Sequence, residues 1–155
     1  MLNYPEINFQ YQVELEDVDE GISIDDQPKE RPFETFGSAS ITYKRDTKPS
    51  KKAIVLANYL CEIDHGHEDF ISKITKENYV EAHHLIPMEF QGEFERSIDV
   101  EANIVSLCPS YHKKLHHGEY SVIEPLIEKL YDERIERLNK CEISLSKDDL
   151  LNYYK

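Results

Sequence analysis

The chain has 155 residues, of which 39% are hydrophobic and 32% are charged. This balance excludes an intrinsically disordered chain, and no apolar run reaches the ~20 residues needed to cross a bilayer. The first residues, MLNYPEINFQ, lack the basic start and apolar stretch of a signal peptide, and three cysteines do not form an even set of disulfides. We therefore expect one small domain in a reducing cytoplasm, without membrane association.

The net charge is −13, and acidic residues outnumber basic ones in every large part of the chain. Residues 1–50 carry 11 acids and 5 bases, residues 51–118 carry 11 and 7, and residues 119–155 carry 9 and 6. Most proteins that bind nucleic acid by themselves show a basic face, because neutralising phosphates supplies much of their affinity. The chain shows no such excess anywhere.

Residues 1–50 are predicted to form an acidic N-terminal arm. The segment VELEDVDEGISIDDQPKERP alternates apolar and acidic residues before Pro28 and Pro32, which predicts one or two short strands and a loop from Gly21 to Ser38. Residues 38–45, SASITYKR, also have strand composition. The acidic run is either a solvated face or a docking surface for a basic partner.

A different pattern begins at Lys51. Residues 51–63, KKAIVLANYLCEI, have apolar side chains at helical spacing and predict a helix of about three turns. Two strands are predicted in NYVEAHH (78–84) and ANIVSLC (102–108), separated by a long loop. The following PSYHKKLHHG (109–118) begins with proline and ends with glycine, as short helices do.

The C-terminal part is predicted to be helical. In YSVIEPLIEKLYDERIERL (120–138), Ile123, Ile127, Leu130 and Leu138 fall near one face of a longer helix, with Pro125 expected in its first turn. SKDDLLNYYK (146–155) opens with capping-box-like spacing and predicts a short closing helix that packs on the domain. The expected organisation is an arm (1–50), a central domain (51–140) and a C-terminal helix (141–155).

Histidines are concentrated in the central unit of strand, loop, strand and helix. All seven fall between His65 and His117. His112 and His116 are four apart on the predicted helix, so that their imidazoles share a face and can hold one cation. His83 and His84 end the first strand, where a twist would let one join the metal while the other faces a substrate. His83, His112 and His116 thus predict a three-histidine site with open positions.

Three more residues fit such a site. His84, unligated and with an ordinary imidazole, could take a proton from an attacking water. Glu81 could accept a hydrogen bond from a ligand imidazole and fix its tautomer. Asn103 opens the second strand, where its amide could bond loop backbone and hold the long connection.

The order EAHHLIP, then Asn103, then CPSYHKKLHHG resembles the motif of the HNH endonucleases, the ββα-metal finger nucleases. The adjacent histidines are similar to those of colicin DNase domains, and NYLCEID, LIPMEFQ and LCPSYHKKLHHG look like bacterial restriction-type HNH proteins. The resemblance covers residues from about Ala53 to Leu138. It implies an α+β fold with a ββα-metal core, flanking helices and the acidic arm.

The resemblance also implies site roles, residue by residue. His84 matches the general base, Asn103 the residue that braces the loop, and the metal ligands match the set His83, His112 and His116. The cofactor would be one divalent cation, and three imidazoles leave Mg²⁺, Mn²⁺, Ni²⁺ and Zn²⁺ all open. The substrate would be DNA, cut to 5′-phosphate and 3′-hydroxyl ends.

The cysteines depart from the restriction-type pattern, in which paired Cys-x-x-Cys knuckles hold a structural zinc. Here each pair keeps only its first member, Cys61 before Asp64 and Cys108 before Tyr111. Because a structural zinc needs four good ligands, we do not expect one. Both thiols are predicted to be small buried apolar groups.

The expected function is therefore a metal-dependent DNA endonuclease of a bacterial restriction or anti-phage defence system. Because the chain is acidic, we expect a partner subunit to supply DNA affinity. The alternatives are a catalytically inactive binding or assembly module that keeps the fold, and a toxin nuclease. The intact site residues argue against the first, and the net charge of −13 argues against the second.

Overall fold

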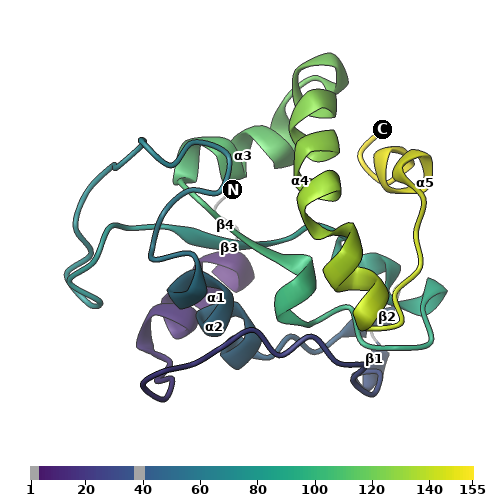
Figure 1. Ribbon diagram of the computed structural model, residues 1–155, viewed down its shortest axis with the longest axis horizontal. Helices are drawn as coiled ribbons and strands as arrows, with labels where there is room; N and C mark the ends of the chain where they lie inside the picture. Colours follow the sequence, from purple (N-terminus) through teal and green to yellow (C-terminus); the bar gives the residue numbers. More distant parts are fainter. Residues whose placement is uncertain (1–3, 37–40) are drawn as a thin grey trace.

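The computed structural model describes residues 4–36 and 41–155 (Figure 1). Two short antiparallel sheets are combined with five α-helices and two 3-10 helices in this part of the chain. In chain order the helices and strands are α1 (Tyr4–Leu15), β1 (Glu34–Phe36), β2 (Ile41–Tyr43), α2 (Thr47–Leu56), β3 (Glu81–His84), β4 (Ile104–Leu107), α3 (Pro109–His117), α4 (Tyr120–Lys140) and α5 (Lys147–Asn152), with the 3-10 helices at Met88–Glu93 and Glu101–Asn103.

The central unit is a ββα arrangement. Strands β3 and β4 pair antiparallel, with Glu81 opposite Leu107 and His84 opposite Ile104. Helix α3 follows β4 directly, begins at Pro109 and stops at Gly118, as predicted from its sequence. The fold is therefore α+β with a ββα-metal type of core, in agreement with the prediction.

Two hydrophobic clusters hold this unit. The larger packs β4 and α3 against the apolar face of α4, which presents Ile123, Ile127, Leu130 and Leu138, the face predicted from the helical spacing. Helix α5 lies beside α4 (Figure 1), and Leu150 completes the cluster.

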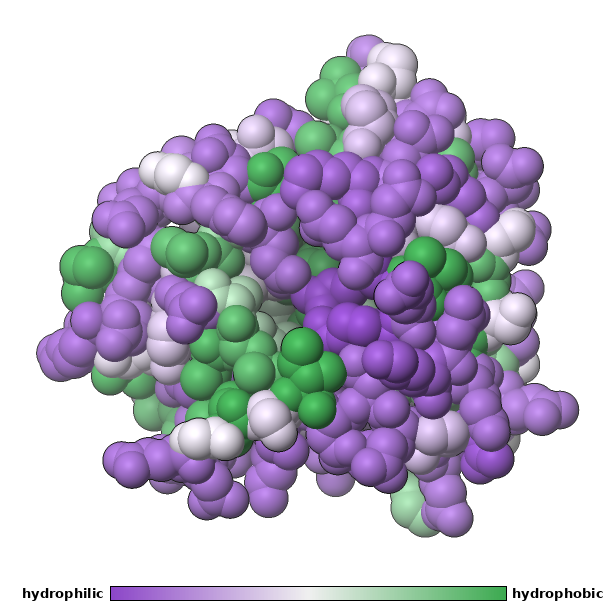
Figure 2. Space-filling model, viewed as in Figure 1, coloured by the Kyte–Doolittle hydropathy of each residue, from purple (hydrophilic) through white to green (hydrophobic). Residues whose placement is uncertain are grey.

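No helix of the described residues is both long and apolar enough to cross a bilayer. On the face shown in Figure 2 the surface is mostly hydrophilic, with a group of apolar side chains in the region of α2 and smaller apolar groups elsewhere.

The N-terminal segment differs from its prediction. Residues 4–15 form helix α1, and the described residues contain no strand before Glu34, so the strands expected in the acidic run are wrong. Phe9 and Val13, four apart, are buried with Ile54 of α2, because one turn of helix places both on the same side while the acidic residues stay outside. The side chain of Gln10 donates to the carbonyl of Ala82 on β3 and accepts from its N–H.

Other boundaries agree in part. Strand β2 lies within the predicted 38–45, although residues 38–40 fall outside the described part of the chain. Helix α2 begins at Thr47 rather than Lys51 because Asp46 caps it, accepting from the N–H of Lys48. Pro125 lies beyond the first turn of α4, since that helix starts at Tyr120. The Ser146 cap of α5 is confirmed.

The division of the chain at residues 50 and 140 remains a prediction. The cysteines are placed as expected for small apolar side chains: Cys61, Cys108 and Cys141 are all buried free thiols. Cys61 and Cys108 lie in the larger hydrophobic cluster.

Candidate metal centre

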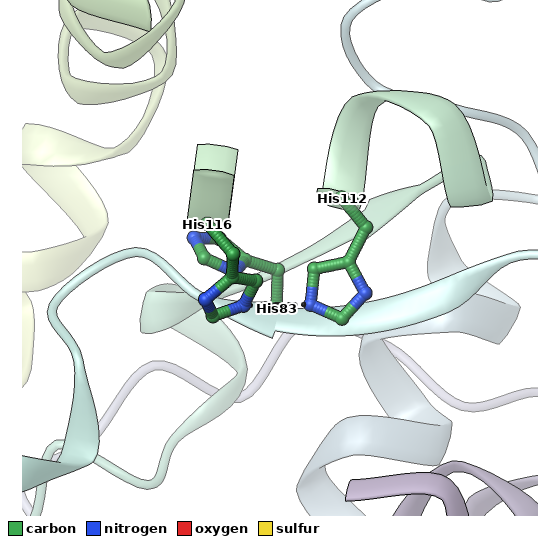
Figure 3. Close-up of side chains that lie close together, drawn as sticks. All are labelled: His83, His112 and His116. Carbon is green, nitrogen blue, oxygen red and sulfur yellow. Dashed lines mark hydrogen bonds between the residues drawn. The ribbon is translucent and has the colours of Figure 1, made fainter. Parts of the chain in front are cut away.

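Three histidines from two elements converge at one place (Figure 3). His83 comes from β3, and His112 and His116 come from successive turns of α3, where residues four apart share a face. One ligand nitrogen from each lies within 4.8 Å of the others. The structure thus brings together the three residues that the sequence predicted as ligands.

Hydrogen bonds fix how His112 presents its ring. Its Nδ1 lies 2.9 Å from Oε1 of Glu81, and the other Glu81 oxygen accepts from the hydroxyl of Tyr79 at 2.7 Å. A carboxylate only accepts, so Nδ1 of His112 carries the proton and Nε2 carries the lone pair. A carboxylate bonded in this way fixes the tautomer and the orientation of an imidazole, which is the arrangement expected of Glu81 and His112.

The spacing of the two α3 histidines fits a small cation. Nε2 of His112 and Nε2 of His116 are 3.1 Å apart. Two lone pairs facing each other at this distance repel unless a proton or a cation lies between them. Metal–nitrogen bonds of ~2.0–2.1 Å at tetrahedral angles place two ligand nitrogens about 3.3 Å apart. The donor set and this distance fit a divalent cation held by His83, His112 and His116.

His83 is oriented by a residue near the end of the described chain. Its Nε2 lies 2.9 Å from the hydroxyl oxygen of Tyr154, and that hydroxyl donates to the backbone carbonyl of Leu85 at 2.6 Å. Because the single hydroxyl proton goes to Leu85, the Tyr154 oxygen accepts from His83. This arrangement protonates Nε2 of His83 and leaves Nδ1 with the lone pair.

The local electrostatics keep the ligand groups ready for a cation. Burial lowers the pKa of His83 well below its ordinary value, and the neighbouring His112 and His116 lower it further. Burial, and then His112, also lower the pKa of His116. Burial raises the pKa of Glu81, but the hydrogen bonds from His112 and Tyr79 outweigh it and bring that pKa below its usual value. These shifts favour the neutral form of His83 and His116 and the ionised form of Glu81.

His84 points to the other side of β3 from its neighbour, as successive strand residues do. Its Nε2 lies 2.8 Å from Oδ1 of Asp99, and both side chains are buried. The carboxylate only accepts, so the lone pair of His84 is on Nδ1. His84 and the three ligand histidines nevertheless line one cavity of about 270 Å³, which also contains Arg45 of the segment before α2.

Asn103 holds the loop between the two strands. Its fully buried side chain accepts from the N–H of Ile86 at 2.7 Å and donates to the carbonyls of Ile86 and Ile98 at 3.0 and 2.8 Å. These bonds tie both ends of the long connection to the start of β4. The geometry is the bracing arrangement predicted for this residue.

Three residues near the site were not found from the sequence. Asp99 lies four positions before Asn103 and outside the motif, and Tyr154 and Arg45 are far from the histidines in the chain. Nothing in their local sequence distinguishes them from ordinary polar residues. Only the folded arrangement places them against the histidines.

The comparison with protein families agrees with this geometry. Residues 61–123 match the family model described as HNH endonuclease. The matched segment contains β3, β4 and α3, and with them every residue predicted for the site. No curated protein matches the chain. This match supports the predicted likeness to the HNH endonuclease family over residues 61–123 and suggests nuclease activity.

Proposed function

We propose that this protein is a metal-dependent endonuclease that hydrolyses phosphodiester bonds in DNA, leaving 5′-phosphate and 3′-hydroxyl ends. The observation that carries the proposal is the single cavity shared by His84 and the three converging histidines. This shared cavity supports the pairing of a proton-accepting group with nitrogen donors suited to a cation. The family of residues 61–123 supports the same reaction class.

His83, His112 and His116 would hold one divalent cation, with Mg²⁺, Mn²⁺, Ni²⁺ and Zn²⁺ all compatible with the donors. When bound, the cation would supply Lewis-acid stabilisation of the charge that develops on the phosphate and on the leaving 3′ oxygen. Glu81 would keep His112 in the tautomer that such binding needs.

His84 would act as the general base. Its Nδ1 would accept a proton from the water that attacks phosphorus, giving an imidazolium. Asp99 would hold the ring in position and stabilise this positive charge, as the carboxylate of a catalytic triad does for its histidine. Asn103 would act indirectly, because it would fix the position, relative to β3, of the loop that carries Asp99.

A bacterial restriction or anti-phage defence system is the proposed context, and the resemblance to restriction-type HNH proteins supports it. The net charge of −13 supports weak binding to isolated DNA and a partner subunit that adds affinity. The acidic N-terminal arm is the proposed docking surface for that partner. Tight, strongly salt-dependent binding of DNA by the isolated chain would contradict this part of the proposal.

The test is nicking of supercoiled plasmid after chelation and re-addition of Mg²⁺, Mn²⁺, Ni²⁺ or Zn²⁺. His84→Ala is the test variant, and His65→Ala, an exposed loop position, is the matched control. We expect metal-restored nicking that is lost in His84→Ala and kept in His65→Ala. Equal nicking by all three proteins would reject His84 as the base. No nicking with any metal, even with subunits that co-purify, would identify an inactive module.

A further inference from the structure

A short basic run interrupts the acidic sequence just before and within α2. Residues 44–52, KRDTKPSKK, contain five Lys or Arg and a single Asp, in a chain of net charge −13. Counts over long segments conceal this run, so the expectation of no basic excess is wrong at this scale. Such a local excess can contact phosphates even in an acidic protein.

The run lines a second cavity, of about 930 Å³, next to the cavity of the histidines. Its basic and aromatic side chains define what we call the basic groove: Lys29, Phe33, Lys44, Arg45, Lys48 and Lys52. Arg45 lines both cavities, and Asp99 in the wall of the groove hydrogen-bonds to His84 in the other. The groove therefore adjoins the site at which the reaction is proposed.

Five carboxylates also line the groove, as many as its Lys and Arg side chains, and all but one make ion pairs or hydrogen bonds within the protein, where they keep their negative charge. These bonds join Asp25 to Lys29, Glu101 to Lys52, Asp46 to the N–H of Lys48, and Asp99 to His84 and to the N–H of Asp46. Glu30 is the remaining acid. Arg45 pairs with Glu6 at 2.9 Å. Lys44 and Lys48 are exposed, and within the described residues neither ammonium pairs with a carboxylate. They are the charges left available for an anionic ligand.

Phe33 adds an apolar surface at the same groove. Its side chain is 90% exposed, so packing within the protein does not account for a phenylalanine at this position. Grooves that hold a single nucleic-acid strand combine cationic side chains, which follow the backbone, with aromatic rings on which bases stack. A duplex keeps its bases stacked inside and offers no base face to such a ring.

We infer that the basic groove binds one unpaired DNA strand and leads its backbone past Arg45 to the histidine site. Lys44 and Lys48 contact phosphates, and Phe33 stacks on a base. The inference rests on the proposed function, which it deepens by naming the form of the substrate. With so few available charges, affinity remains modest, in keeping with the acidic balance of the chain.

Binding is measured by fluorescence anisotropy with a labelled DNA strand of about 20 nucleotides and with its duplex, under chelation and from ~50 to ~200 mM salt. The expected result is tighter binding of the single strand. The Lys44→Ala/Lys48→Ala variant reduces by about 1.4 the steepness with which the logarithm of the affinity falls with the logarithm of the salt concentration. Phe33→Ala weakens binding at least about fivefold. Lys73→Ala/Lys140→Ala removes two exposed charges outside both cavities and leaves binding unchanged.

Hydrolysis of bis(p-nitrophenyl) phosphate, which is too small to occupy the groove, separates this inference from the proposed function. The inference is supported if the Lys44→Ala/Lys48→Ala variant hydrolyses this ester as fast as the unaltered protein does but binds DNA more weakly. Unchanged DNA binding in that variant, a preference for the duplex, or no measurable binding by the unaltered protein overturns it. Groove-dependent binding without hydrolysis of either substrate rejects the proposed function and keeps the groove.

Discussion

Replacing Asn103 by alanine tests whether this side chain braces the long loop. The substitution removes an acceptor for the N–H of Ile86 and a donor for the carbonyls of Ile86 and Ile98, at a position with no exposed surface. Each buried polar group left without a partner costs ~1–3 kcal/mol. Because carbonyls tolerate a missing bond better than an N–H does, we expect a loss of about 3 kcal/mol in the free energy of unfolding.

The assay is urea unfolding followed by circular dichroism. For a slope near 2 kcal/mol per M, the expected loss moves the midpoint down by roughly 1.5 M. Asn139→Ala, at the exposed end of α4, is the control and should stay within ~0.5 kcal/mol of the unaltered protein. A loss below ~1 kcal/mol for Asn103→Ala would refute the bracing role.

Asn103→Asp sharpens the test. A carboxylate can still accept from Ile86 but faces two carbonyl oxygens, so its pKa in the folded protein should rise above the unfolded value of about 3.9. A raised pKa contributes stability that is present at low pH and lost as the pH rises through it. The free energy of unfolding of Asn103→Asp should therefore rise relative to that of Asn103→Ala as the solution is acidified. A constant difference between the two variants would contradict this account.

Three further outcomes follow from the site. Tyr154→Phe removes the acceptor for His83 and should weaken metal binding ~10–100-fold by calorimetry; an unchanged dissociation constant would show that the hydroxyl does not position the ring. Burial lowers the pKa of His83, so the metal-free protein should lose up to about 1.4 kcal/mol of stability per pH unit below pH ~6.5, where the unfolded chain binds the extra proton. In thermal melts, His83→Gln should reduce this dependence of stability on pH. An equally steep dependence in the variant would assign it to another group. Asp99→Asn should lower kcat by about 10²-fold or more with little change in KM, and a change confined to KM would reject its role toward His84.

The sequence predicted the convergence of His83, His112 and His116 better than it predicted the N-terminal fold. His112 and His116 share a helix face because of a fixed spacing, and His83 lies next to His84, the last residue of β3, so local rules were enough to place them. Asp99, Tyr154 and Arg45 reach the site only through tertiary packing. No periodicity in a single sequence encodes that approach.

The N-terminal prediction was wrong for an identifiable reason. The alternation in residues 13–16, VELE, has a period of two, which favours a strand when read alone. The helix is instead selected by Phe9 and Val13, whose burial against α2 exceeds any local preference of the acidic residues that follow. The basic run at 44–52 was missed for a different reason, because charges were counted over segments longer than the run itself.

The contact between Gln10 and Ala82 has a consequence for solubility. In the described part of the chain, strand β3 pairs with β4 on one side only, and the amide of Gln10 occupies both backbone hydrogen-bonding positions of Ala82. An unpaired strand edge is a template on which a second chain can add, so α1 shields this protein from self-association. Gln10→Ala should raise light scattering at high protein concentration, and an unaltered scattering curve would show that the edge is protected by other means.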